Sequence, residues 1–106
     1  MTDPQLRRGM LDICVLTALA DEDSYGYRII RDLSEVVEIS ESTLYPILKR
    51  LESAGSLMVY SVEHNGRLRK FYHLTDAGRA RIPEFLSDFE GILKIHQFIL
   101  RRWKHE

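Results

Sequence analysis

The chain has 106 residues, of which 44% are apolar and 29% are charged. This composition is typical of one small folded domain with a modest core, and it excludes a disordered or fibrous chain. The net charge of −1 argues against a protein that binds polyanions over its whole surface.

Charge is distributed unevenly along the chain. Residues 21–39 hold six acids and two bases, whereas residues 40–74 hold three acids and five bases. A basic segment in a nearly neutral chain indicates a binding face of limited area. The single cysteine, Cys14, excludes a disulfide within the chain, and no apolar run is long enough to span a membrane. We therefore expect a protein of the reducing cytoplasm with no membrane partner.

The first two predicted elements are helices. Residues 5–20 are apolar on nearly every side, which predicts a helix that is mostly buried. The acidic residues 21–23 predict a solvated turn. Ser24 is expected to be the N-cap of a second helix over residues 25–37. The inner face of that helix is expected to hold Tyr27, Ile30, Leu33 and Val37.

Residues 41–54 are predicted to form a third helix, with Ser40 as its N-cap and Gly55 ending it. One side carries apolar residues at helical spacing, and these are expected to join the core: Leu44, Ile47, Leu48 and Leu51. The other side is polar and carries Ser42, Thr43, Tyr45, Lys49 and Arg50.

A β-hairpin follows the third helix. Residues 57–63 and 69–74 read as strands, and Asn65-Gly66 between them is a strong signal for a tight hairpin turn. A turn at this point pairs Leu57 with Leu74 and Val59 with Tyr72 on the face that covers the core. It pairs Tyr60 with Phe71 and Val62 with Arg69 on the other face. The tip carries Arg67, Arg69 and Lys70.

The last predicted element is a long helix that runs to about residue 103. Thr75 is expected to cap a short helical turn, and Pro83 fits either the start of a separate helix or a kink in a continuous one. Apolar residues beyond Pro83 recur at spacings of three and four, as in a heptad seam. A second copy of the chain is the expected partner for them: Phe85, Leu86, Phe89, Ile92, Leu93, His96, Ile99, Leu100 and Trp103.

The predicted order of elements is that of a winged helix-turn-helix domain over residues 1–80, followed by a dimerisation helix over residues 81–106. The fold class is mainly α with a two-stranded β-wing. A helix followed by a basic wing suits duplex DNA, because the helix fits the major groove and the wing reaches the backbone. The expected DNA contacts are base edges for Ser42, Thr43 and Tyr45 and phosphates for Lys49, Arg50, Arg67, Arg69 and Lys70. Tyr45 also fits a place at the edge of the core.

Several short motifs in these elements resemble the PadR family of bacterial transcriptional regulators. They are Tyr25-Gly26-Tyr27, Leu44-Tyr45-Pro46, Leu51-Glu52 with Gly55, and residues 69–75 with Gly78. The resemblance covers roughly residues 6–80. It implies a dimeric repressor of a palindromic operator, of the short class in which a single C-terminal helix makes the dimer.

The resemblance also implies that a small, flat hydrophobic effector can bind between protomers, near an aromatic residue of the last helix. Phe89 stands at that place here, and a phenyl ring offers less stacking area than the indole of a tryptophan and no N–H donor. The residues expected to line such a site are Phe89, Ile92, Leu93 and His96 with Met10, Ile13 and Cys14. A packed interface without a cavity is the alternative.

No residue pattern indicates catalysis. There is no phosphate-binding loop, nucleophile motif or metal-ligand spacing, and His64, His73, His96 and His105 are scattered along the chain. We therefore expect no enzyme activity, no cofactor and no metal. The alternative to DNA binding is a protein–protein adaptor in which the winged module and the last helix bind a partner protein.

Overall fold

The computed structural model describes residues 4–103. The order of elements within this range confirms the mainly helical class with a two-stranded wing. The bounds are Pro4–Ala18 for α1, Gly26–Leu33 for α2, Glu41–Ser53 for α3, Leu57–His64 for β1, Arg67–Leu74 for β2 and Asp76–Trp103 for α4.

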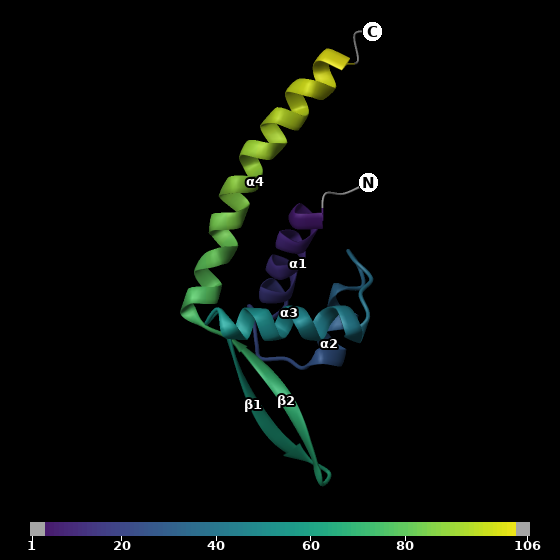
Figure 1. Ribbon diagram of the computed structural model, residues 1–106, viewed down its shortest axis with the longest axis vertical. Coiled ribbons are helices and arrows are strands. Elements are labelled where there is room, and N and C mark those ends of the chain that lie inside the picture. Colours follow the sequence, from purple (N-terminus) through teal and green to yellow (C-terminus); the bar gives the residue numbers. More distant parts are fainter. Residues whose placement is uncertain (1–3, 104–106) are drawn as a thin grey trace.

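The molecule is elongated, with extents of 64 × 26 × 21 Å. Figure 1 shows three parts along its length. Helices α1, α2 and α3 form a central body, the hairpin of β1 and β2 projects from one end, and α4 rises on the opposite side. The first part of α4 packs beside α1, and its C-terminal part extends beyond the end of α1 (Figure 1).

The core lies where the first three helices meet the base of the hairpin. Val15 and Leu16 of α1 and Ile29 of α2 are completely buried, and so is Leu44 of α3. Burial of each such side chain stabilises the fold by about 1.5–3 kcal/mol. The predicted stripe of α3 is confirmed, because all four of its apolar side chains are buried: Leu44, Ile47, Leu48 and Leu51.

The prediction for the inner face of α2 was wrong for Tyr27 and confirmed for the other three residues, because Leu33 is buried and Ile30 and Val37 pack against the core. Tyr27 is 66% exposed, whereas Gly26, Ile29 and Leu33 are buried. Residues 26, 29 and 33 are three and four positions apart and therefore share one face, and residue 27 is turned away from it. The helix also ends at Leu33 rather than at residue 37.

Ser24 is not the N-cap of α2. Its backbone pairs with Tyr72 of β2 through two hydrogen bonds, of 3.2 Å from the N–H of Ser24 and 2.8 Å from the N–H of Tyr72. The N-cap is Tyr25, whose side chain makes no capping hydrogen bond. The connection between α1 and α2 thus acts as a short third strand beside β2, an arrangement that local sequence signals do not reveal.

The register of the hairpin was predicted correctly. Leu57 pairs with Leu74, Val59 with Tyr72 and Tyr60 with Phe71. Asn65 and Gly66 in the turn have positive φ angles of 52° and 78°, as the mirror-image turns of tight hairpins require. Gly55, with a φ of 79°, follows the end of α3 as predicted.

α4 is one continuous helix through Pro83. Proline lacks an N–H, so one intrahelical hydrogen bond is missing at that point. The boundary predicted at residues 80 and 81 falls inside this helix. Its first turn is capped by Thr75, whose Oγ1 accepts a 3.0 Å hydrogen bond from the N–H of Gly78. Ser40 precedes α3 as expected but makes no side-chain capping bond.

Two properties of the described helices and side chains bear on function. No helix within residues 4–103 is long and apolar enough to cross a membrane. The same range contains no cluster of three or more His, Cys, Asp or Glu side chains arranged to hold a metal ion. His105 and the outer limits of the two predicted units lie outside the described residues.

Candidate nucleic-acid interface

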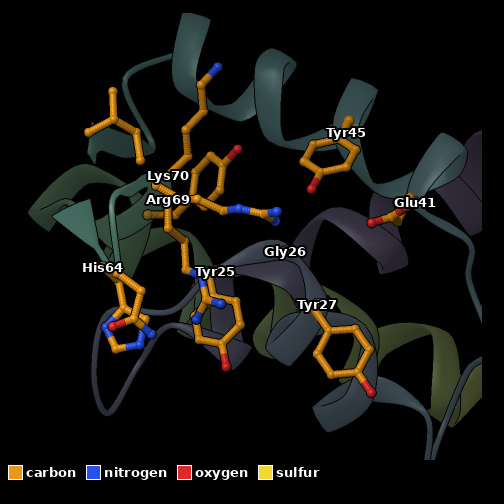
Figure 2. Close-up of a pocket in the computed structure, with 12 residues that line it drawn as sticks. Tyr25, Gly26, Tyr27, Glu41, Tyr45, His64, Arg69 and Lys70 are labelled. Atoms are coloured by element: carbon orange, nitrogen blue, oxygen red, sulfur yellow. The ribbon is translucent and has the colours of Figure 1, made fainter. Parts of the chain in front are cut away.

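An open groove of about 850 Å³ separates the wing from the start of α2 and α3. In Figure 2, His64, Arg69 and Lys70 of the hairpin lie on one side of this groove, and Tyr45 and Glu41 of α3 lie on the other. The complete lining is Tyr25, Gly26, Tyr27, Glu41, Tyr45, His64, Asn65, Arg67, Leu68, Arg69, Lys70 and Tyr72. The groove therefore combines tyrosine rings with the cations of the wing.

The wing cations are exposed and have no carboxylate partner among residues 4–103. This holds for Arg67, Arg69 and Lys70, and also for Lys49 on α3. Their N–H groups therefore remain able to donate to an external anion. The guanidinium of Arg69 also lies over the ring of Tyr25. A cluster of unpaired cations on one side of a neutral protein attracts phosphate groups.

Arg50 differs from these four cations. Its guanidinium donates to the carboxylate of Asp12 on α1, which is only 8% exposed. The pair joins α1 to α3 inside the body of the protein. Arg50 was expected to contact phosphate from the exposed side of α3. The ion pair uses its Nη2 group, and the side chain remains 32% exposed.

The exposed start of α3 carries a cluster of hydroxyl groups. Oγ of Ser40 lies 2.9 Å from Oγ of Ser42 and 3.3 Å from Oγ1 of Thr43. All three residues are exposed, so these hydroxyl groups are available to a ligand. Ser42, Thr43 and Lys49 do not line the groove, so α3 presents a separate face beside it.

Tyr45 was expected either to contact DNA bases or to lie at the edge of the core. Its side chain is 45% exposed and lines the groove, so it is not a core residue. Its hydroxyl group sits over Gly26, where a Cβ atom would be only 2.7 Å from the phenolic oxygen. Glycine at position 26 therefore allows the start of α2 to approach α3 closely. Burial, with smaller effects of Tyr45 and Glu52, raises the pKa of the neighbouring Tyr72 above its usual value.

Asp23 is bonded to both strands of the wing. The predicted turn at residues 21–23 is therefore not simply solvated. Oδ2 of Asp23 accepts a 2.6 Å hydrogen bond from the hydroxyl of Tyr60, and its Oδ1 lies 2.7 Å from Nδ1 of His73. These bonds, that of Tyr60 above all, lower the pKa of Asp23 below its usual value. The same bond raises the pKa of Tyr60. One carboxylate thus connects both strands to the chain before α2.

Sequence reasoning did not predict eight of the residues that line the groove: Tyr25, Gly26, Tyr27, Glu41, His64, Asn65, Leu68 and Tyr72. The Tyr25-Gly26-Tyr27 motif was noticed only as part of the family resemblance. Two aromatic residues flanking a glycine are a usable signal for an exposed aromatic surface. Pairing of the preceding residue, Ser24, with β2 is what brings these rings to the wing.

Most of the predicted dimer residues of α4 are exposed. Leu86, Ile92, Leu93, Ile99, Leu100 and Trp103 all expose at least two fifths of their surface, and Trp103 exposes 69%. Ile95 and Phe98 on the same helix are exposed as well. Phe85 and Phe89 are half-buried and stack on each other with ring centroids 5.8 Å apart. Such an apolar helix is unfavourable in water.

The α1 residues of the predicted effector site are half-buried. Met10, Ile13 and Cys14 have this partial exposure, and Ile13 and Cys14 also pack against the core. Burial raises the pKa of the Cys14 thiol. α1 packs against α4.

Three helices followed by a two-stranded wing define a winged helix-turn-helix protein, and a long helix is added at the end of it. A family model described as the transcriptional regulator PadR-like family matches residues 15–84. The chain therefore belongs to the PadR-like family of transcriptional regulators, which are not enzymes.

Related proteins support this assignment along most of the chain. A transcriptional regulator of Mycobacterium tuberculosis is 35% identical over 81 residues, which cover 76% of this chain and 76% of that protein. The structure of a PadR-like transcription factor from Bacteroides fragilis is 34% identical with a TM-score of 0.79, and the match covers 90% of this chain and 94% of that one.

A third relative was solved with a ligand. The structure of Bacillus subtilis PadR in complex with operator DNA is 25% identical, with a TM-score of 0.66. The match covers 72% of this chain and 46% of that protein. The two chains therefore share a winged core, while more than half of the Bacillus subtilis protein has no counterpart in the match.

Proposed function

We propose that this chain is a dimeric repressor that binds a pseudo-palindromic DNA operator through α3 and the wing. The observation that carries the proposal is a set of exposed cations on α3 and the wing that have no carboxylate partner among residues 4–103: Lys49, Arg67, Arg69 and Lys70. Most hydrogen bonds between proteins and DNA go to phosphate and sugar, and cations in this position supply them. The operator complex of Bacillus subtilis PadR supports the same role for this fold.

In this proposal α3 enters the major groove. An α-helix fits the width of that groove, and the exposed hydroxyl groups of Ser42 and Thr43 stand at the start of α3, where they can meet base edges. Tyr45 lines the groove of the protein beside the wing. Lys49 would contact a phosphate of the DNA backbone. Arg50 donates to Asp12 through Nη2, and its remaining N–H groups would donate to a phosphate.

The exposed apolar side chains of α4 support a dimer. A second copy of the same helix would cover Ile92, Leu93, Ile99 and Leu100 and remove them from water, and this burial stabilises association. Residues 1–80 would then form the DNA-binding unit and residues 81–106 the dimer contact. Two-fold symmetry of the dimer predicts two operator half-sites about one helical turn apart, or a multiple of it.

A small hydrophobic or aromatic effector is the proposed regulator of this dimer. Apolar side chains of α1 and α4 would meet between the protomers, where Met10, Ile13 and Cys14 face the region of Phe89, Ile92, Leu93 and His96. An effector releases DNA only if it binds the DNA-incompetent arrangement of the two winged units more tightly than the competent one. Release therefore requires a change in the spacing of the two α3 helices.

Fluorescence anisotropy with the DNA just upstream of the gene for this protein, at several salt concentrations, tests the DNA-binding role. Binding should weaken steeply as salt rises, and Lys49→Ala, Arg67→Ala and Lys70→Ala should each reduce the slope of log affinity against log salt by about 1. Lys94→Ala, which removes the same charge from an exposed position on α4, is the matched control and should leave the slope unchanged.

Absence of a sequence-dependent complex at low salt, with a dimer present in solution, would reject DNA binding and favour an adaptor that binds a partner protein. Equal slopes for the wild type and all four variants would show that these cations do not contact phosphate.

A further inference from the structure

The backbone of Tyr25 is held by hydrogen bonds of the residue before it and of its own carbonyl group. The preceding residue, Ser24, is paired with Tyr72 of β2 by two hydrogen bonds. Tyr25 itself is extended, with φ −132° and ψ 165°, and its carbonyl accepts a 2.9 Å hydrogen bond from the N–H of Ile29 in α2. It is therefore both the end of a short strand and the N-cap of a helix, which leaves its Cα little freedom.

The ring of Tyr25 is also held in place. It makes an edge-to-face contact with Phe71 of β2, with centroids 5.4 Å apart and an interplanar angle of 63°. Phe71 stacks in turn on Tyr60 of β1 at 5.8 Å, and the hydroxyl of Tyr60 is bonded to Asp23. A row of three rings thus crosses the connection before α2 and both strands of the wing.

The guanidinium carbon of Arg69 lies 4.3 Å from the centroid of the Tyr25 ring. Arginine stacks on an aromatic ring through the flat face of its guanidinium, so the N–H groups at the edge stay free. No carboxylate within residues 4–103 pairs with them. Figure 2 shows Arg69 and Tyr25 together at the side of the groove formed by the wing.

Arg28 is a natural comparison, because its guanidinium carbon lies 5.4 Å from the same ring. Its Nε and Nη2 groups are already used: Nε donates to Oγ of Ser24 at 2.9 Å, and Nη2 donates to the carbonyl of Asp23 and pairs with Glu22 at 3.2 Å. Of the two arginines at Tyr25, Arg69 is therefore the one whose N–H groups have no hydrogen-bond or carboxylate partner within residues 4–103.

We propose that Tyr25 is a positioning residue that holds the guanidinium of Arg69 ready to donate to a phosphate of the DNA backbone. The proposal rests on the DNA-binding role proposed above. A flexible arginine loses side-chain freedom when it binds, and a ring that orders it beforehand reduces this loss. Arg67 and Lys70 have no aromatic support of this kind among the described residues, so Arg69 is the ordered contact of the wing.

The test measures operator affinity for Tyr25→Leu and Tyr25→Phe, each alone and combined with Arg69→Gln. Tyr25→Leu should weaken binding about 3- to 10-fold, because it removes the stacking surface. Tyr25→Phe keeps the ring and should restore affinity to within about 2-fold of the wild type. In the Arg69→Gln background, Tyr25→Leu should change affinity by less than about 2-fold, because the supported group is gone.

Tyr27→Leu is the matched control. Tyr27 is exposed and lines the same groove but has no contact with Arg69 in the structure, so its effect should be equal in both backgrounds. Equal effects of Tyr25→Leu with and without Arg69 would overturn the positioning role. If the wild type binds no DNA, the proposed function fails, which is a separate result.

A measurement on the free wild-type protein covers the case in which Tyr25→Leu does not fold. The side-chain protons of Arg69 should be shifted upfield in the NMR spectrum by the ring current of Tyr25. Signals of Arg69 at the positions of an unstructured arginine would overturn the proposal without any substitution.

Discussion

Nδ1 of His73 lies 2.7 Å from Oδ1 of Asp23, so a base in the second strand of the wing is bonded to an acid in the connection before α2. A carboxylate is an acceptor only, so His73 donates this hydrogen bond. Tyr60 donates a second bond to the same carboxylate from the other strand. The orientation of the wing relative to the helical body therefore depends on residues from three separate segments.

Asp23→Asn should lower stability in a pH-dependent way. The pKa of Asp23 is lowered in the folded state, mainly by Tyr60 and then by His73. The stabilisation is therefore present above the usual aspartate pKa of about 3.9 and is lost as the pH falls through the lower folded value. Urea unfolding should show a loss of about 1 kcal/mol at pH 7, which is typical of one hydrogen bond, and a smaller loss near pH 3.

The exposed neighbour Asp21 supplies the control for this experiment. Asp21→Asn removes the same charge at an exposed position two residues before Asp23, and should change the free energy of unfolding by less than about 0.5 kcal/mol at either pH. A loss for Asp23→Asn that is the same at pH 7 and at pH 3 would contradict a role for its ionised form.

Gly78→Ala should be strongly destabilising. Gly78 is buried in the first turn of α4, and a Cβ atom there would collide with the carbonyl oxygen of Ser56. Because the obstacle is backbone, the substitution should lower the free energy of unfolding by about 1–3 kcal/mol or more. Gly91→Ala lies in the same helix with open space around it, and should raise stability by up to about 1 kcal/mol. Thermal unfolding of both variants compares them directly, and equal effects would argue against this packing.

Asp12→Asn should destabilise the body of the protein without changing its surface. Asp12 is buried and is the partner of Arg50, so the substitution leaves a partly buried guanidinium without its carboxylate. A loss of about 1–3 kcal/mol is expected in urea unfolding. Asp32→Asn tests the size of a surface pair, because Asp32 lies 3.9 Å from the exposed Arg31. Asp32→Asn should lower the free energy of unfolding by less than about 1 kcal/mol. An equal loss for Asp32→Asn and Asp12→Asn would contradict a special contribution of the buried pair.

Ile99→Glu should convert the proposed dimer to a folded monomer. Ile99 is 57% exposed in the single chain, so the charge does not disturb the fold of the protomer. At a helix–helix contact the carboxylate would be buried without a partner, which costs about 3 kcal/mol and raises the dissociation constant about 100-fold or more. Light scattering after size-exclusion chromatography measures the mass. Gln97→Glu adds the same charge on the same helix, and dissociation by both variants alike would show that Ile99 is not at the contact.

Local patterns predicted the elements that are stabilised by local chemistry. Asn65-Gly66 determines the hairpin turn and hence the whole register, because a two-residue loop with positive φ allows only one pairing. The apolar spacing of α3 identifies its buried face for a similar reason. In α2 the same reasoning misplaced Tyr27, because eight residues offer few positions to distinguish neighbouring faces. It also misplaced the N-cap, because the backbone of Ser24 pairs with Tyr72 of β2.

The amino-acid sequence by itself determined the order of elements, the hairpin register, the position of cations on the wing and the apolar last helix, since each follows from neighbouring residues and backbone preferences. Only the tertiary structure decided which cations stay free. Arg50 is bonded to Asp12 and Arg28 to the α1–α2 connection, whereas Arg69 rests on Tyr25 with its N–H groups available. The reason is that a charge's partners are set by packing between segments far apart in the chain, which no local pattern encodes.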